Sequence, residues 1–253
     1  MQKGINMINH IGEEKYSKYG TLSKIIEQKS NYIVIEFQDE YKTNLRTSYV
    51  NWKNNEFKNP YDKSVLNVAC IGKVKGTENG KVKKSYKTWY SMINRCYNKD
   101  FHNIEKTYKD CSVCNEWLCY ENFEKWYNEN YYEIDGENMH LDKDIIIKGN
   151  KVYSPETCCF VPQRINKLFI KNDKIRGDLP IGVSHNRSRH NFLVQCCTKT
   201  NRIKKYFKDK NEAFLFYKNI KEKYIKEVAD EYKDKIPQKL YEAMYNWKVE
   251  ITD

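Results

Sequence analysis

The chain has 253 residues, with 45 Lys and Arg against 34 Asp and Glu, and a formal net charge of +11. This excess favours an anionic partner such as nucleic acid. There is no apolar run of roughly 18 residues and no signal-peptide core near the N-terminus, so neither a membrane span nor export is expected. The nine cysteines are therefore expected to be reduced thiols in a cytoplasmic protein.

The first segment, residues 1–78, predicts a small accessory β-rich module. The run "YIVIEF" at residues 32–37 is β-branched and aromatic, and "GTLSKIIE" and "KTNLRTSYV" flank it as further strands. The run "KNPYDKS" predicts a turn, because the residue before Pro60 is pushed out of the helical region.

Residues 79–172 form the middle segment, which opens with two amphipathic helices. In "SYKTWYSMINRCYN" Ser85 is the expected N-cap, and in "YENFEKWYN" Phe123, Trp126 and Tyr127 share one face. The first helix has an apolar stripe at Trp89, Met92, Ile93 and Cys96. These aromatic residues are interpreted as packing residues and not as base-stacking residues.

A strand–turn–strand–helix pattern follows in the same segment. A strand is predicted around residues 141–147, a turn at Gly149-Asn150, a second strand around residues 158–161, and a helix from Gln163. Pro162 suits the first turn of that helix.

Residues 173–253 predict three short strands and a long helix. The strands are "IGVSH", "NFLVQCC" and "RIKKYF", and Asp209 with Glu212 forms a capping box at the helix start. The expected buried face of this helix is Ala213, Phe214, Tyr217, Ile220, Tyr224, Ile225 and Val228. A final short helix is predicted in "PQKLYEAMYNW", and the fold class is therefore α+β.

The positive charge is concentrated on the three predicted strands and the link before them. Residues 171–208 contain ten basic and two acidic residues, whereas residues 209–253 contain nine Lys and ten acidic residues. A basic sheet of this kind can contact phosphates or enter a groove of DNA. The alternative is a solvated, lysine-rich surface without a ligand.

The strand–turn–strand–helix pattern can also hold a metal ion. Asp142 at one end and Asn166 in the helix offer hard oxygen ligands that suit Mg²⁺. A divalent ion there polarises a scissile phosphate, and a nearby base activates water.

The run "LDKDIIIKGNKVYSPETCCFVPQRIN" resembles the HNH (His-Me finger, ββα-metal) nuclease motif. Together with "W..MINRCYN" and "YKDCSVCNEW", it is similar to the HNH homing-type endonucleases of bacteriophages. The run "GVSHNRSRHNFLVQCC", with the helix after it, resembles the Apetala-two-type DNA-binding domain. The resemblance covers roughly residues 85–245.

The resemblance implies a phage-encoded, metal-dependent endonuclease that acts on double-stranded DNA in the cytoplasm of an infected bacterial host. It implies Asp142 and Asn166 as ligands of Mg²⁺ or Mn²⁺. Lys143 stands where the base histidine is expected and Thr157 where the orienting asparagine is expected. His140 lies two residues before Asp142 and is a substitute base, with Asp144 on the same face by strand alternation.

The expected DNA contacts come from the helix after the second strand and from the basic sheet. They are Arg164, Arg187, Arg189, His190, Lys199, Arg202, Lys204 and Lys205.

Three alternatives stay open. The stretch after His140 can be an edge strand with solvated charges. The two departures from the motif can also mean that the protein is catalytically degenerate. Such a protein would bind nucleic acid, a host protein or a host nucleoprotein, and would act as a regulator or as an inhibitor of a host nucleic-acid or defence system. Cys111 and Cys114 form one CxxC pair that Cys158 and Cys159 could complete, but adjacent cysteines fit zinc poorly and a structural zinc is not expected.

Overall fold

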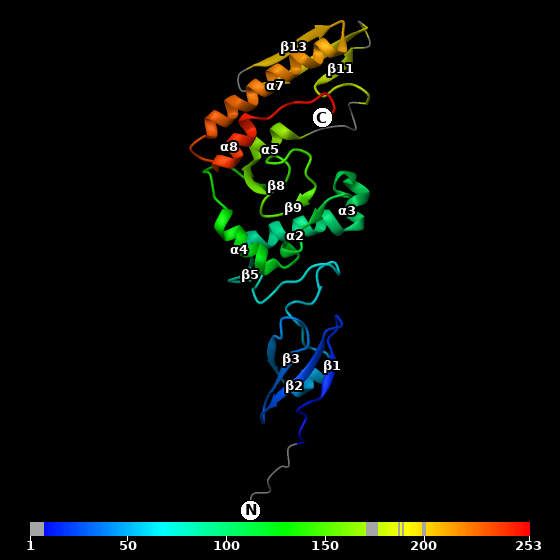
Figure 1. Ribbon diagram of the computed structural model, residues 1–253, viewed down its shortest axis with the longest axis vertical. Helices are drawn as coiled ribbons and strands as arrows, with labels where there is room; N and C mark the ends of the chain where they lie inside the picture. The colour runs from blue at the N-terminus through cyan, green and yellow to red at the C-terminus, as the bar shows by residue number, and fades with distance from the viewer. Residues whose placement is uncertain (1–7, 171–176, 187, 189, 199–200) are drawn as a thin grey trace, which may run out of the picture. The chain divides into compact units, whose positions relative to one another are not determined.

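The computed structural model describes residues 8–170, 177–186, 188, 190–198 and 201–253, and it is a mixed α+β protein (Figure 1). The chain divides into two compact units, one up to Glu129 and one from Asn130 onward. Within the described ranges no helix has both the length and the apolar character needed to cross a bilayer.

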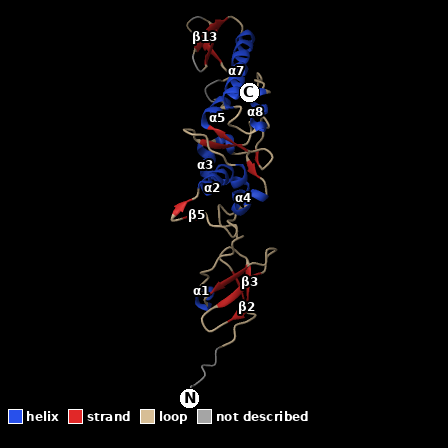
Figure 2. Ribbon diagram, turned by 90° about the vertical axis from the view of Figure 1, so that its left-hand side faces the viewer, coloured by secondary structure: helices blue, strands red, loops and turns tan. Residues whose placement is uncertain are grey.

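The N-terminal part of the first unit is a four-stranded antiparallel sheet (Figure 2). Its strands, in spatial order, are β1 (Glu14–Tyr16), β2 (Leu22–Gln28), β3 (Ile33–Phe37) and β4 (Asn44–Thr47). Alternate residues of β3, namely Ile33, Ile35 and Phe37, are buried, as the period of a half-buried strand requires. The predicted strands are confirmed. The short helix α1 (Tyr49–Lys53) was not predicted, and Ser48 caps it by accepting from the Asn51 N–H.

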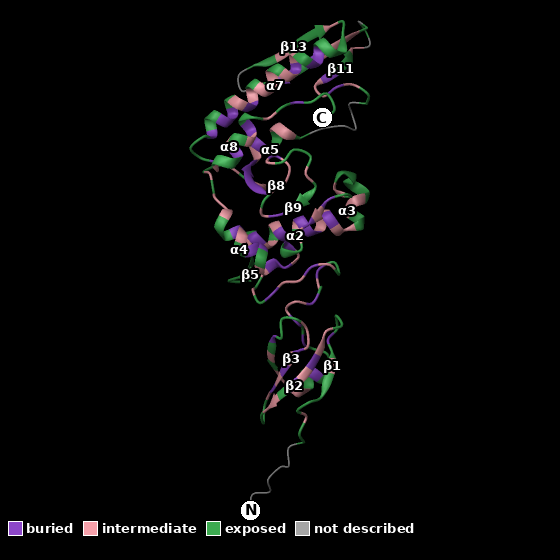
Figure 3. Cartoon of the chain, in the orientation of Figure 1, coloured by how far each residue is buried: buried purple, intermediate pink, exposed green. Residues whose placement is uncertain are grey.

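The rest of the first unit is mostly helical. Its elements are β5 (Thr77–Glu78), β6 (Lys81–Val82), α2 (Lys84–Tyr97), α3 (Lys99–Ile104), the 3-10 turn η1 (Lys106–Tyr108), β7 (Ser112–Val113), the 3-10 turn η2 (Glu116–Leu118) and α4 (Tyr120–Asn130). The predicted apolar stripe of α2 is buried (Figure 3). The predicted cap is wrong: α2 begins at Lys84, and the buried Ser85 hydroxyl instead hydrogen-bonds with the Tyr120 hydroxyl (2.8 Å).

The second unit begins with a strand pair and a helix. The elements are β8 (Met139–Asp142), β9 (Val152–Tyr153), β10 (Cys159–Pro162) and α5 (Gln163–Phe169). The turn at Gly149-Asn150 is confirmed, with Gly149 at a φ of +79° and the Asn150 N–H donating to the Ile147 carbonyl. The first predicted strand is wrong in its second half, because β8 ends at Asp142 and residues 143–147 bend.

A three-stranded antiparallel sheet and two helices complete this unit. They are β11 (Val183–Asn186), β12 (Asn191–Cys197), β13 (Arg202–Phe207), α7 (Lys210–Tyr232) and α8 (Gln238–Tyr245). Asp209 caps α7 by accepting from the backbone N–H groups of Asn211 and Glu212, which confirms the Asp209 half of the predicted capping box. Of the seven predicted core residues of α7, Ile220 and Tyr224 are only partly buried and the other five are buried.

The long helix α7 belongs to two hydrophobic clusters. Its N-terminal half packs on the sheet through Ala213, Phe214 and Tyr217. Its C-terminal half packs with residues of β10, α5 and α8 through Ile225, Val228, Ala229 and Tyr232. The domain boundary expected near residue 172 stays a prediction, but residues on both sides of it share one core.

Candidate functional site

The paired strands β8 and β10 place Asp142 and His140 on the face that α5 covers. Asp142 lies opposite Cys159, and His140 lies opposite Val161, in an antiparallel register. Residues directly opposite in such a pair point to the same face. Cys159 and Val161 pack in one cluster with Ile165 of α5, so Asp142 and His140 point toward this helix and not away from it.

The carboxylate of Asp142 ends the strand and is held by the backbone after it. Its Oδ1 atom accepts from the N–H groups of Asp144 (2.9 Å) and Ile145 (2.8 Å). Burial, and then the nearby Asp144 carboxylate, raise the pKa of Asp142 to about 6. The prediction that strand alternation places Asp144 on the same face as Asp142 is wrong, because β8 ends at Asp142. The turn brings Asp144 next to Asp142, and a divalent cation would relieve the repulsion between the two charges.

Lys143 lies at the base position of the motif but is already engaged. Its Nζ atom lies 3.2 Å from Asp144 Oδ2 and 5.7 Å from the centre of the Tyr153 ring. Only 13% of its side chain is exposed. An ion pair favours the protonated lysine, whereas a general base must accept a proton. This geometry disfavours Lys143 as a general base.

Thr157 and Asn150 stabilise the loop between the two strands. The Thr157 hydroxyl donates to the Val152 carbonyl (2.8 Å) and hydrogen-bonds with the Ser154 hydroxyl (3.1 Å). The Asn150 amide donates to the carbonyls of Lys143 and Val152, both at 2.7 Å. Thr157 thus has a clear role in the loop, and its predicted role in orienting the base stays a prediction.

The helix α5 carries Asn166 and Arg164 in different settings. Asn166 follows the buried Ile165 and is half-buried, and its side-chain amide has no hydrogen-bond partner among the described residues. The Arg164 guanidinium donates to Glu231 of α7 (2.7 Å) and lies 5.7 Å from the Tyr232 ring centre. This hydrogen bond raises the pKa of Arg164, so a phosphate would have to compete with Glu231 for the guanidinium.

The donor set fits one hard divalent ion with few protein ligands. In the described part of the chain no group of three or more His, Cys, Asp and Glu side chains is arranged to hold a metal. Mg²⁺ is commonly bound by one or two carboxylates, with waters and substrate phosphates supplying the other oxygens. The half-buried Asp142 carboxylate, its neighbour Asp144 and the Asn166 amide are residue types compatible with such a site.

The two cysteines near this site, Cys158 and Cys159, are buried thiols. Burial raises the pKa of Cys158 to about 12 and raises that of Cys159 as well. The expectation that no structural zinc is bound stays a prediction.

The three-stranded sheet has one face covered by α7 and one open face. The open face consists of Leu193, Gln195, Cys197, Arg202, Lys204 and Tyr206, by alternation from the buried Val194 and Cys196. The Gln195 side-chain amide is oriented with its oxygen toward Arg202. In this orientation the oxygen accepts hydrogen bonds from the Arg202 guanidinium. The Lys204 ammonium lies 5.5 Å from the Tyr206 ring centre.

Not every predicted DNA contact belongs to this open face. Lys205 lies opposite Val194 on the covered face, and its ammonium is 4.6 Å from the ring centre of Phe216 in α7. Neighbouring strand residues point to opposite faces, so Lys205 and Lys204 lie on opposite faces of the sheet. The contact of the exposed Lys205 with DNA stays a prediction. His190 is exposed in the loop before β12, with a φ of +48°. Arg187, Arg189 and Lys199 lie outside the described residues.

Lys239 of α8 is a residue near the site that sequence reasoning missed. Its ammonium donates to the Cys158 carbonyl (3.4 Å), next to the residue opposite Asp142. The two residues are 81 positions apart, so no local pattern could have paired them.

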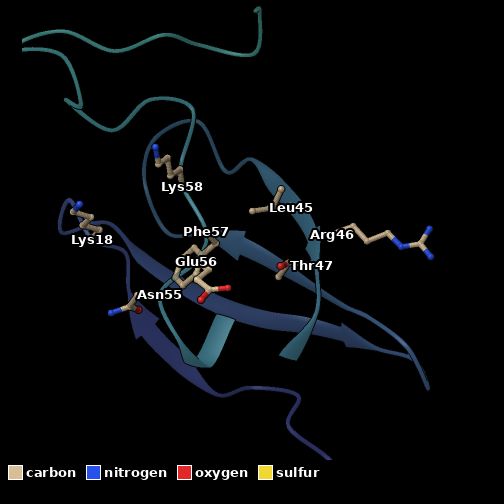
Figure 4. Close-up of a pocket in the computed structure, with 8 residues that line it drawn as sticks. All are labelled: Lys18, Leu45, Arg46, Thr47, Asn55, Glu56, Phe57 and Lys58. Atoms are coloured by element: carbon tan, nitrogen blue, oxygen red, sulfur yellow. The ribbon is translucent and has the colours of Figure 1, made fainter. Parts of the chain in front are cut away.

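A pocket of about 460 Å³ opens beside β4 in the N-terminal sheet (Figure 4). Leu45 and Thr47 of β4 and Glu56, Phe57 and Lys58 of the segment after α1 line it. Its charged lining residues are Lys18, Arg46, Lys58 and Glu56. A comparison of the chain with models of known protein families, with curated proteins and with solved structures finds no match.

Proposed function

We propose that this chain is a DNA-binding, metal-dependent endonuclease of the HNH type, which nicks or cuts phosphodiester bonds. The observation that carries the proposal is the position of Asp142. Its carboxylate is half-buried and lies beside Asp144, on the face of two antiparallel strands that the helix with Asn166 covers. The sequence resemblance supports the same reaction.

Asp142 and Asn166 would hold one Mg²⁺ or Mn²⁺ ion, which when bound polarises the phosphate and stabilises the leaving oxygen. His140, on the same strand face as Asp142, would take the proton from the attacking water. Lys143 would keep its proton and balance the charge of Asp144. Arg202 and Lys204 on the open face would contact DNA phosphates.

The second candidate is a protein that binds nucleic acid, or a host protein, without cutting. The ion-paired Lys143 at the base position and the loop role of Thr157 favour it, because neither residue has the environment that the motif requires. Asp142 would then be a remnant whose loss leaves binding intact.

A nicking assay on supercoiled plasmid with Mg²⁺ or Mn²⁺ separates the two candidates. We expect Asp142→Ala and Asn166→Ala each to lower the nicking rate by at least about a hundredfold, because each removes a metal ligand. The matched control is Asp135→Ala, an exposed acid in the same unit, which should nick like the wild type.

The same assay identifies the base. His140→Ala should lower the rate by about a hundredfold or more, and Lys143→Ala by much less. The opposite order would assign the base to Lys143. If the wild type shows no nicking but binds DNA in a salt-dependent way, and Asp142→Ala binds equally well, the endonuclease is excluded and the binding protein is favoured.

A further inference from the structure

The two hydrophobic clusters of the second unit follow one another along a single uninterrupted helix. The three-stranded sheet packs on Ala213, Phe214 and Tyr217 of α7. The strand–helix site, which consists of β8, β10 and α5, packs on Ile225 and Val228. A continuous helix between two packed cores leaves no flexible joint between them along this path.

The C-terminal strap, residues 246–253, connects the same two clusters by a second path. Trp247 packs against both clusters, and its ring centre lies 4.5 Å from that of Phe169 at the end of α5. Two residues later Val249 is buried in the sheet cluster, and its N–H donates to Glu222 of α7 (2.8 Å). The strap therefore ties α5 to the sheet alongside α7.

Polar contacts fix α5 and the segment before β8 to the C-terminal half of α7. Arg164 of α5 pairs with Glu231 at 2.7 Å. The Tyr232 hydroxyl donates to Glu137, two residues before β8, at 2.5 Å. These directional bonds restrain rotation of the strand–helix site about the axis of α7. Apolar packing alone would restrain this rotation less strongly.

We infer that the open face of the sheet and the Asp142 site form one rigid DNA-engaging body, in which α7 sets the distance between them. The rigidity rests only on the packing described here. Its consequence for DNA rests on the proposed function: the cleaved bond lies at a fixed offset from the base pairs that the sheet contacts. A nuclease joined to its binding domain by a flexible linker would instead cut over a range of positions.

Along α7 the two packing regions, centred near Phe214 and Val228, are separated by about 21 Å of helix at about 1.5 Å per residue. A rigid body holds this separation constant, so the offset between the bound base pairs and the cleaved bond is constant as well.

The first test measures the distance directly in the full chain. Spin labels on non-cysteine unnatural amino acids at the exposed positions Ser184 and Lys167 report the separation of the sheet and α5. We expect one narrow distance distribution, unchanged when six Gly/Ser residues are inserted between Ile170 and Gly177. A broad distribution, or one that broadens on insertion, would overturn the inference. Trp247→Ala should broaden it, and Ile251→Ala in the exposed part of the strap should not.

The second test maps cleavage against the sheet footprint on the same DNA. Wild type and the insertion variant should cut at the same offset, within about one nucleotide, and Trp247→Ala should cut over a wider range. An offset that moves with the insertion would overturn the fixed spacing. A narrow distance distribution without any cleavage would refute the proposed function and leave the rigid body standing.

Discussion

At the scale of single residues, Asp142 is unusual because the fold disfavours the ionised form of its carboxyl group. Asp142 accepts two backbone hydrogen bonds, which favour its ionised form, yet burial and Asp144 outweigh them. Such perturbed carboxyls are common at functional sites and also occur in structural charge networks. Because the pKa of Asp142 differs between the folded and unfolded states, the free energy of unfolding depends on pH.

We expect Asp142→Asn to stabilise the protein at pH 7, by on the order of 2 kcal/mol, and to change its stability little near pH 4. The folded pKa of about 6 lies above the reference value of 3.8. The native state therefore binds the extra proton in this window, and stability is lost as pH rises from about 4 to about 6. Urea unfolding at several pH values measures this difference, with Asp135→Asn as the control. A difference that is the same at all pH values would contradict the pKa assignment.

A second residue-scale feature is the pair Cys70 and Cys119 in the first unit. The two residues are partners in an isolated parallel bridge, and the Cys70 N–H donates to the Leu118 carbonyl at 2.9 Å. A hydrogen bond from the Cys70 thiol, with the N–H groups of Glu121 and Asn122, lowers the pKa of Cys119 to about 7 against the effect of burial. A thiolate near a helix N-terminus is the reactive form of cysteine.

Alkylation by iodoacetamide, followed residue by residue with mass spectrometry, tests this pair. The rate at Cys119 should rise with pH with a midpoint near 7, because the thiolate is the reacting species. Cys70→Ala removes the thiol that donates to Cys119 and should shift the midpoint upward. A midpoint that Cys70→Ala leaves unchanged would mean that the backbone N–H groups alone stabilise the thiolate.

At the scale of elements, strand alternation decides which cations of the sheet lie on its open face. Lys204 and Lys205 are neighbours in sequence with equal charge, yet Lys204 lies on the open face and Lys205 lies above Phe216 of α7. Charge counting along the chain cannot separate them, whereas the register of β12 with β13 does.

The matched pair Lys204→Ala and Lys205→Ala turns this difference into a prediction. Lys204→Ala, like Arg202→Ala, should weaken DNA binding and reduce the dependence of log K on log salt by about one unit, the value for one lost phosphate contact. Lys205→Ala should leave this slope unchanged. Fluorescence anisotropy over a salt series measures both, and equal slopes for the two lysine variants would show that the open face is not the binding surface.

The elements also show where periodicity predicts well and where it fails. The stripe of α2 and the alternation of β3 were predicted because burial follows their periods of 3.6 and 2. The strand expected through residue 147 stops at Asp142, because its carboxylate captures two backbone N–H groups and turns the chain. Ser85 has the sequence signature of a cap but faces Tyr120 in the core.

At the scale of the whole molecule, the second unit should unfold as one piece, since its two clusters share α7. Ile225→Ala should cost about 2–5 kcal/mol as a buried large-to-small change. Native-state hydrogen exchange should then show lower protection in both β10 and β12, with α2 of the first unit unchanged. Loss of protection in β10 alone would show that the sheet and the strand–helix site unfold independently.

Local patterns in the sequence predict the α+β class, the order of strands and helices, the capped start of α7 and the concentration of positive charge on three strands. These depend on local patterns, such as periodicity, caps and turns, whose physics acts over a few residues. Tertiary structure decided which face Lys205 occupies, that Glu231 engages Arg164, that Lys143 pairs with Asp144, and that the strand–helix site and the sheet share one helix. Most of these depend on contacts between segments far apart in the chain, and the Lys143–Asp144 pair depends on a turn built by the Asp142 carboxylate. Packing and three-dimensional charge placement, and not local propensity, determine both kinds of contact.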